Sequence, residues 1–120
     1  MNNTLKLTNG TTIEVANEDY SSEKIQNGEL NKLITKDGWR LPSIKELDLI
    51  FKRRHEISIG NFQDDWYWSN DSFQVSWDYE VNMVYNFHDG SINAESFGFG
   101  SRSHSLSDAY VRLVRILTTN

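Results

Sequence analysis

Four oxygen-bearing side chains are the first candidates for chemistry in this 120-residue chain. Asp64, Asp65, Asn70 and Asp71 stand on either side of Trp66-Tyr67-Trp68. Carboxylate and amide oxygens at this density could hold Ca²⁺, which takes several oxygen ligands. No recognisable calcium-binding pattern is present, so we interpret them as solvated loop residues and predict no resident metal or cofactor. A calcium-assisted site is the alternative.

The histidines and serines do not form a recognisable catalytic pattern. His55, His88 and His104 lie far apart, and none has metal-ligand spacing with another histidine. Ser103, His104 and Asp108 supply the residue types of a catalytic triad, but the surrounding small-residue segment has no nucleophile-elbow pattern. The chain has no cysteine, which excludes thiol nucleophiles, disulfides and cysteine-ligated metals. We therefore predict that the chain is not an enzyme.

Aromatic side chains are better candidates, and for binding. Trp66 and Trp68 should point to one face of their strand and Tyr67 to the other. Phe97 and Phe99 lie in or beside a small-residue loop, where an exposed aromatic would anchor a partner. The alternative is that each aromatic fills the core. The predicted binding face comprises residues 61–76 and 96–108, with the contacts Trp66, Asp71, Phe99, Arg102 and His104.

Two kinds of ligand fit such a face. A protein partner would need an aromatic anchor inside a polar rim, without a metal. A glycan would need exposed aromatics beside Asp and Asn side chains, with calcium in support. The acidic balance favours a protein partner, so we predict a small stand-alone binder or inhibitor. A carbohydrate-binding, adhesin-type module is the alternative.

Composition and charge narrow the partners and the location. The net charge is −5 and the pI about 5.1, which argues against a nucleic-acid binder. The one basic run, Lys52-Arg53-Arg54, falls where a helix should end and suits the dipole there. The sequence shows no signal peptide and no membrane-spanning run. We expect a cytoplasmic protein, or an extracellular or virion-associated one if the chain belongs to a longer protein.

The predicted elements are a hairpin, two helices and then strands. Alternation around Asn9-Gly10 predicts a hairpin within residues 1–16. Helices are predicted over 21–36 and 43–55, the second opening with a capping box between Ser43 and Glu46. Alternating apolar residues predict a strand over 75–87 with a bend near Asp78, and further strands over 91–97 and 110–117. This order indicates one α+β domain with an antiparallel sheet.

Three segments in this order carry a family resemblance: Gly38-Trp39-Arg40-Leu41-Pro42-Ser43 with Glu46-Leu47, Tyr67-Trp68-Ser69-Asn70, and Tyr110-Val111-Arg112-Leu113-Val114-Arg115. Together they resemble the bacterial domain family found at the C-terminus of collagen-like adhesins. The resemblance covers roughly residues 20–117. It implies a C-type-lectin-like fold, with two helices packed on a twisted antiparallel sheet and long loops on one face.

The resemblance also implies recognition in place of catalysis, and structural roles for the motif residues. We expect Trp39 to pack in the core. Arg40, Arg112 and Arg115 should pair with buried carboxylates or backbone carbonyls, because a lone buried charge is too costly. Glu46 is expected to serve one of these arginines while it caps its helix with Ser43. The family's association with trimers and polyanionic glycans transfers poorly to an acidic chain without a collagen repeat.

Overall fold

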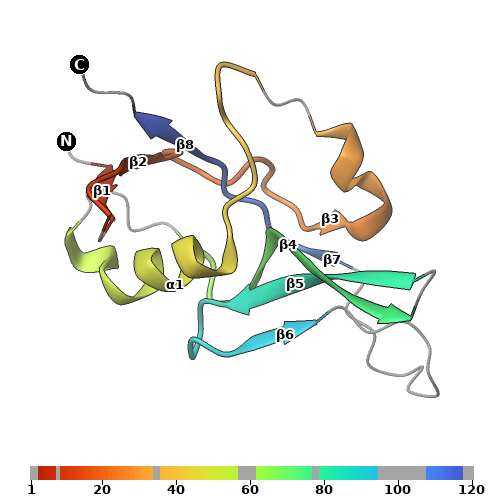
Figure 1. Ribbon diagram of the computed structural model, residues 1–120. Coiled ribbons are helices and arrows are strands. Elements are labelled where there is room, and N and C mark those ends of the chain that lie inside the picture. The colour runs from red at the N-terminus through yellow and green to blue at the C-terminus, as the bar shows by residue number, and fades with distance from the viewer. Residues whose placement is uncertain are drawn as a thin grey trace.

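The computed structural model describes residues 3–7, 9–33, 36–56, 62–76, 79–94 and 108–117. Within them it contains one α-helix, two short 3₁₀ helices and eight strands in three small sheets (Figure 1). The elements are β1 (Thr4–Lys6), β2 (Thr12–Val15), β3 (Ile25–Gln26), η1 (Asn27–Lys32), α1 (Ile44–Lys52), η2 (Arg54–Glu56), β4 (Trp66–Ser76), β5 (Tyr79–Asn86), β6 (Ile92–Ala94), β7 (Asp108–Ala109) and β8 (Val114–Leu117).

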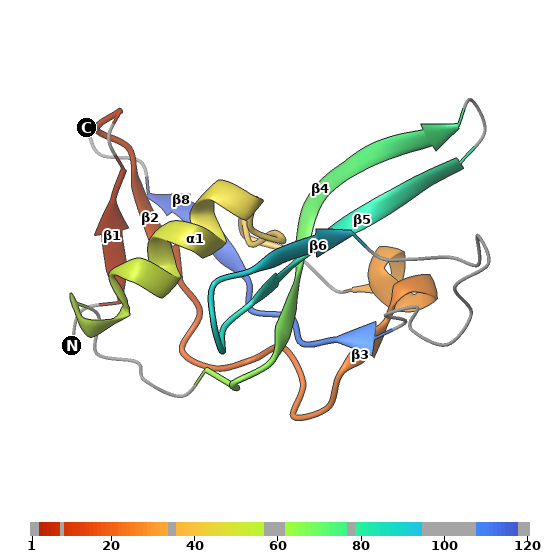
Figure 2. The same ribbon diagram turned by 90° about the horizontal axis from the view of Figure 1, so that it is seen from below.

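The predicted N-terminal hairpin is confirmed. β1 pairs antiparallel with β2, and Gly10 occupies the connecting turn at a φ of +90°, a conformation that glycine adopts without strain. β8 adds to the other edge of β2, which gives the order β1-β2-β8. α1 lies across this sheet (Figure 2), and its Leu47 and Ile50 pack in one cluster with Ile13.

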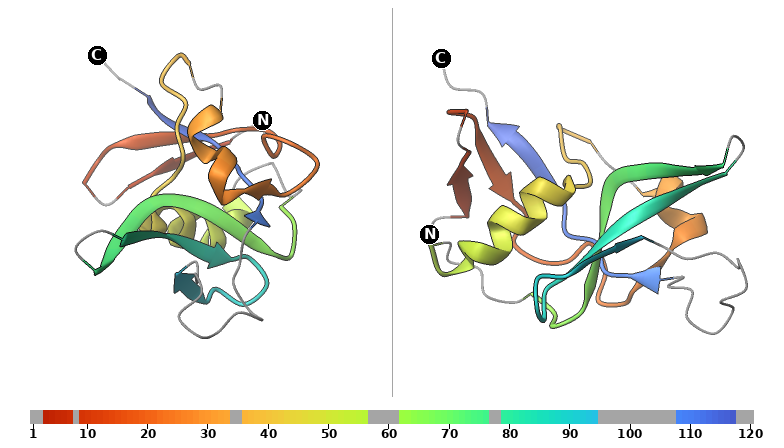
Figure 3. Two further views of the ribbon diagram at one scale, coloured as in Figure 1. Left: turned by 90° about the vertical axis from the view of Figure 1, so that its right-hand side faces the viewer. Right: turned by 60° about the horizontal axis from the view of Figure 1, so that its bottom comes forward.

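The predicted strand over 75–87 is divided differently in the structure. Residues 75–76 end β4 and residues 79–86 form β5, which pairs antiparallel with β4 along most of its length. The β4–β5 register shifts twice, and the outer half of this hairpin points away from α1 and β1 (Figure 3, right). β6 pairs with Met83–Tyr85 of β5, after a turn that contains Gly90 at a φ of +79°.

The predicted helix over 21–36 is wrong. Ile25–Gln26 forms β3, which pairs with β7, and only Asn27–Lys32 coils, as a 3₁₀ helix. Gly28 weakens any helix through this segment. The backbone carbonyl of Ile25 instead accepts a hydrogen bond from the indole of Trp68 at 2.7 Å. A tertiary hydrogen bond and a two-residue ladder replace the helix.

The expectation of a C-type-lectin-like α+β fold is therefore wrong as well. That fold requires two helices on a twisted antiparallel sheet, whereas the described residues contain a single nine-residue α-helix and three small sheets. The closing segment is divided too. β7 belongs to the β3 sheet, β8 belongs to the β2 sheet, and residues 110–113 join them.

Two clusters of buried side chains fill the space between the sheets. Tyr67 belongs to the cluster beneath α1, while Trp68 belongs to a second cluster with Val111. Trp66 packs against the cluster of Trp68. The predicted alternation of Trp66, Tyr67 and Trp68 is thus confirmed. These first residues of β4 lie between the two clusters.

Candidate functional site

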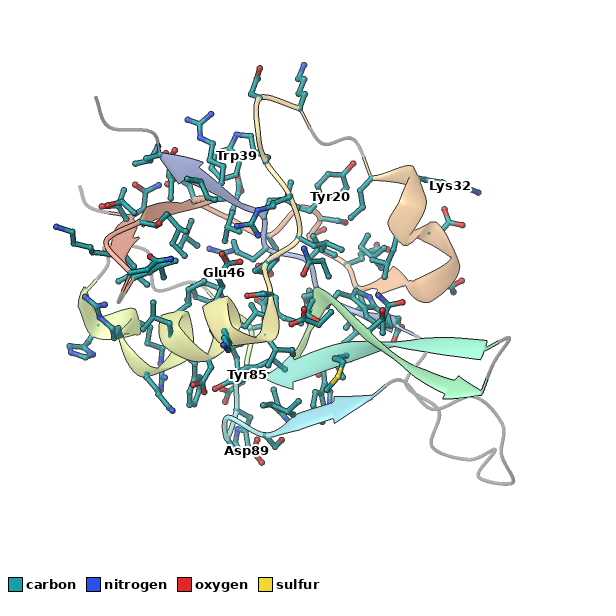
Figure 4. The ribbon with its side chains drawn as sticks, viewed as in Figure 1. Tyr20, Lys32, Trp39, Glu46, Tyr85 and Asp89 are labelled. Carbon is teal, nitrogen blue, oxygen red and sulfur yellow. The ribbon has the colours of Figure 1, made fainter. Side chains whose placement is uncertain are left out.

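The first motif segment forms the N-terminus of α1. Ser43 Oγ accepts a hydrogen bond from the Glu46 amide at 3.1 Å, and Glu46 Oε1 accepts from the Ser43 amide at 2.8 Å, so the predicted capping box is present. The Arg40 guanidinium donates to both Glu46 oxygens at 2.8 Å. Glu46 points from α1 toward the middle of the molecule (Figure 4). One carboxylate therefore caps the helix and binds the motif arginine.

These contacts set the protonation of the pair. Burial pushes the pKa of Glu46 upward, but hydrogen bonds from Arg40 and from Ser43 outweigh burial, so this pKa lies below its ordinary value. The hydrogen bond to Glu46 raises the pKa of Arg40. Both groups stay charged across the physiological range.

The third motif segment contributes a buried arginine. Arg112 is fully buried, and its Nε donates to Asp19 Oδ1 at 2.9 Å while Nη1 donates to the Ala16 carbonyl at 3.0 Å. The Tyr67 hydroxyl bonds to both Asp19 oxygens at 3.0 Å. Burial, with Asp19 adding to it, raises the pKa of Tyr67. Asp19 thus joins residues of two motifs, although no sequence pattern marked it.

Arg115 and Trp39 lie together at the edge of the second cluster. Arg115 Nε donates to Glu14 Oε1 at 2.7 Å, and its guanidinium lies 4.5 Å from the centre of the Trp39 ring. Trp39 is only partly buried, packed against the second cluster and covered by Arg115. The expectation that Trp39 packs inside the core needs this correction.

Of the five predicted contact residues, the structure describes Trp66 and Asp71, and these two have different surroundings. Trp66 is partly buried against the second cluster. Asp71 Oδ2 accepts a hydrogen bond from the Ile44 amide at 2.7 Å and so holds the N-terminus of α1. Phe99, Arg102 and His104 lie outside the described residues.

The acidic residues around β4 are also divided among separate partners. Asp65 pairs with Lys24 at 2.9 Å, and Asp64 lies 3.1 Å from the ring of His88. Among residues 3–117 as far as they are described, no three His, Asp or Glu side chains are grouped as metal ligands. Asp64, Asp65 and Asp71 therefore each contact a different partner: His88, Lys24 and Ile44.

A pocket between η2 and the β5–β6 turn is the most site-like concavity of the described residues. Its volume is about 340 Å³, and it is lined by Arg54, His55, Phe62, Gln63, Asp64 and Phe87. We call it the Phe62 pocket. Phe62 and Phe87 stack with ring centres 4.7 Å apart and an interplanar angle of 11°. This arrangement gives an aromatic floor with charged and polar groups at the rim.

The floor of the Phe62 pocket is fixed by the motif network. The Arg112 guanidinium lies 4.1 Å from the centre of the Phe62 ring. The Gln63 amide donates to the Tyr67 hydroxyl at 2.8 Å. Sequence reasoning placed residues 61–76 on the binding face but did not single out Phe62 or Arg54. Two sequence features pointed to lining residues of this pocket: the alternating apolar positions of 75–87, which end at Phe87, and the basic run that ends at Arg54.

A second concavity, of about 320 Å³, lies between α1 and the β1–β2 turn. It is lined by Leu7, Asn9, Ser43, Lys45, Glu46 and Leu49. The Ser43 and Glu46 groups here are already bonded in the capping box. These two groups therefore serve the helix, and the Phe62 pocket, with its aromatic lining, is the stronger candidate.

Comparison with known proteins adds no relative. No family model, curated protein or solved structure matches this chain. Within the described residues, no helix has the length and apolar character needed to cross a membrane. The resemblance to the adhesin C-terminal domains stays a prediction from its three motifs.

Proposed function

We propose that this chain is a recognition module that binds a protein partner and performs no catalysis. The observation that carries the proposal is the Phe62 pocket, an open depression with an aromatic floor and a charged rim. Aromatic anchors in pockets surrounded by polar groups are typical of protein interfaces. Phe62, Gln63 and Asp64 belong to the face that the sequence predicted for binding.

The use of the charged side chains supports recognition over catalysis. Arg40 is bound to Glu46, Arg112 to Asp19, and Arg115 to Glu14. Tyr67 and Glu46, whose pKa values shift, are held inside the scaffold and do not line the Phe62 pocket. A catalytic site would be expected to place perturbed groups in its cleft.

Affinity capture with matched variants tests the proposal. The wild-type chain is compared with Arg54→Glu and Lys32→Glu in capture from host lysate, followed by mass spectrometry. Arg54 lines the Phe62 pocket, whereas Lys32 is 70% exposed on η1, at the other end of the molecule (Figure 4). We expect one near-stoichiometric protein with the wild type and Lys32→Glu, and its loss with Arg54→Glu.

Two results would contradict the proposal. An empty capture, combined with binding on a glycan array, would assign the chain to the carbohydrate-binding alternative. Equal capture by all three forms would move the interface away from the Phe62 pocket. The thermal stability of both variants is measured alongside, because Arg54 also stacks on Phe51 and donates to its carbonyl.

A further inference from the structure

Resting on the proposed function, we propose that the Phe62 pocket binds an aromatic side chain standing beside a carboxylate in the partner protein. The aromatic ring would contact the accessible part of Phe62, which Phe87 supports from below, and the carboxylate would face Arg54. The ligand is thus an acidic, aromatic peptide segment. This assignment goes further than protein binding in general, because it names the chemical groups that the pocket binds.

The floor of the pocket accounts for the aromatic part. Phe87 is 4% exposed and Phe62 is half-buried, so both rings are held in place before any ligand arrives. Phe87 already meets Phe51 at an angle of 87°, with ring centres 5.5 Å apart. Aromatic pairs favour such edge-to-face or offset stacked contacts. Because Arg112 and Phe87 already lie against the Phe62 ring, a ligand ring would join this cluster at an edge of Phe62.

The rim accounts for the carboxylate. Arg54 and His55 stand on the η2 side, and they follow directly after Lys52 and Arg53. On the other side, Asp64 already contacts His88 at 3.1 Å. Lys52 is paired with Asp48 at 2.9 Å, so Arg53 and Arg54, set against Glu56, keep this end of α1 locally basic on a chain of net charge −5. Complementary charge of this kind orients an acidic partner and suppresses wrong ones.

Buried residues position the pocket. Asp19 holds Arg112 beneath Phe62, and Tyr67 holds the backbone of Gln63. Tyr67 and Arg112 are therefore positioning residues that link two family-type motifs to the pocket wall. A pocket held rigid before binding loses less freedom when the ligand enters, which favours affinity.

An NMR titration tests the assignment with small probes. The ¹⁵N-labelled full chain is titrated with N-acetyl-phenylalanine, which carries a carboxylate, and with N-acetyl-phenylalaninamide, which does not. We expect shifts at the amides of Gln63, Asp64 and His55 with both probes. The carboxylate probe should bind about fivefold more tightly, as one partly exposed charge pair would provide.

Matched variants separate the two parts of the ligand. Arg54→Gln should remove the preference for the carboxylate probe, while Lys32→Gln should leave it unchanged. Sodium sulfate serves as a probe without a ring. Stronger shifts with sulfate than with the aromatic acid would mean a plain anion site and would overturn the assignment.

Absence of shifts at the pocket with millimolar probes would also overturn it, as would equal affinity for the two aromatic probes. These failures are distinct from failure of the proposed function. A captured partner that binds without Arg54 would leave protein recognition standing and remove only the aromatic-acidic ligand. An empty capture with a positive titration would leave the aromatic-acidic ligand of the pocket standing and count against a protein partner in the host lysate.

Discussion

Glu46 has both a local role, as a cap of its own helix, and a tertiary role, as the partner of Arg40. Its carboxylate caps α1 and binds Arg40 through both oxygens, with a side chain only 11% exposed. The sequence predicted both roles, because the Ser43-to-Glu46 spacing defines a capping box and a nearby arginine needs a partner. It could not supply Asp19, since nothing local marks a residue whose two partners lie far along the chain.

Replacement of Glu46 by Gln tests the charge of that carboxylate while keeping a side chain that can cap. The pKa of Glu46 is lower in the folded chain than its ordinary value. Its contribution is therefore present above about pH 4.3 and lost as the pH falls through the folded pKa. We expect Glu46→Gln to lower the free energy of unfolding at pH 7 by about 1 kcal/mol. The variant should also lose stability less steeply in acid, measured by urea unfolding from pH 7 to 3.

Exposed Glu23 provides the control for this measurement, since Glu23→Gln should follow the wild-type acid profile. A Glu46→Gln profile parallel to that of the wild type would mean that the Arg40 pair does not stabilise the fold.

Asp19 compensates the only fully buried guanidinium in the described chain. Asp19→Asn keeps the shape of the side chain but removes the carboxylate charge that pairs with Arg112. Removing one partner of a buried pair is expensive, so we expect a loss of about 3 kcal/mol in the free energy of unfolding. Asp37→Asn, at an exposed position with a φ of +60°, should change stability by less than about 0.5 kcal/mol. Similar small losses for both variants in urea unfolding would contradict a charge-dependent role for Asp19.

At the scale of elements, prediction from sequence succeeded where the signal was local. The β1–β2 hairpin follows from Asn9-Gly10 and its flanking alternation, and α1 follows from Ser43 and Glu46. The segment 21–36 failed because its outcome depends on distant atoms. Ile25 finds β7 and the Trp68 indole, neither of which is visible in a local pattern.

The N-terminus of α1 depends on a strand that lies far along the sequence. Asp71 of β4 accepts from the Ile44 amide, so it supplements Ser43 as a cap. We expect Asp71→Ala and Ser43→Ala each to lower the free energy of unfolding by about 1 kcal/mol, the usual effect of losing a cap. Asp71→Ala should leave partner capture unchanged, because its carboxylate serves the scaffold. If Asp71→Ala kept normal stability but no longer captured the partner, Asp71 would instead belong to the binding face.

At the scale of the whole molecule, many short elements cover two clusters of buried side chains, which lie on either side of the start of β4. Its dimensions of 48 × 27 × 26 Å reflect the β4–β5 hairpin extending past the rest (Figure 2). Motif order alone suggested a C-type-lectin-like arrangement. The actual sheets depend on pairings between short strands that are far apart in the sequence, such as β3 with β7 and β2 with β8. Local residue patterns do not predict such pairings.

Two buried tyrosines of the cluster beneath α1, Tyr67 and Tyr85, affect how the stability of the whole molecule depends on pH. Tyr85 donates to Asp48 at 2.6 Å, and burial together with Asp48 raises the pKa of Tyr85, as burial does for Tyr67. A raised pKa in the folded chain means that this stability is complete below about pH 10, where unfolded tyrosine is protonated, and is lost above it.

We therefore expect the free energy of unfolding to fall steeply above about pH 10, with each of these two tyrosines contributing up to about 1.4 kcal/mol per pH unit. Tyr85→Phe should make the alkaline fall shallower, although it loses the hydrogen bond to Asp48 at every pH. Exposed Tyr20 is the control, because Tyr20→Phe should keep the wild-type slope. Lys24, whose pKa is raised chiefly by the hydrogen bond to Asp65, adds a fall that is common to all three forms. Guanidinium unfolding at pH 9 to 11 measures the slopes, and equal slopes for wild type and Tyr85→Phe would show that Tyr85 ionises as readily in the folded chain as in the unfolded one.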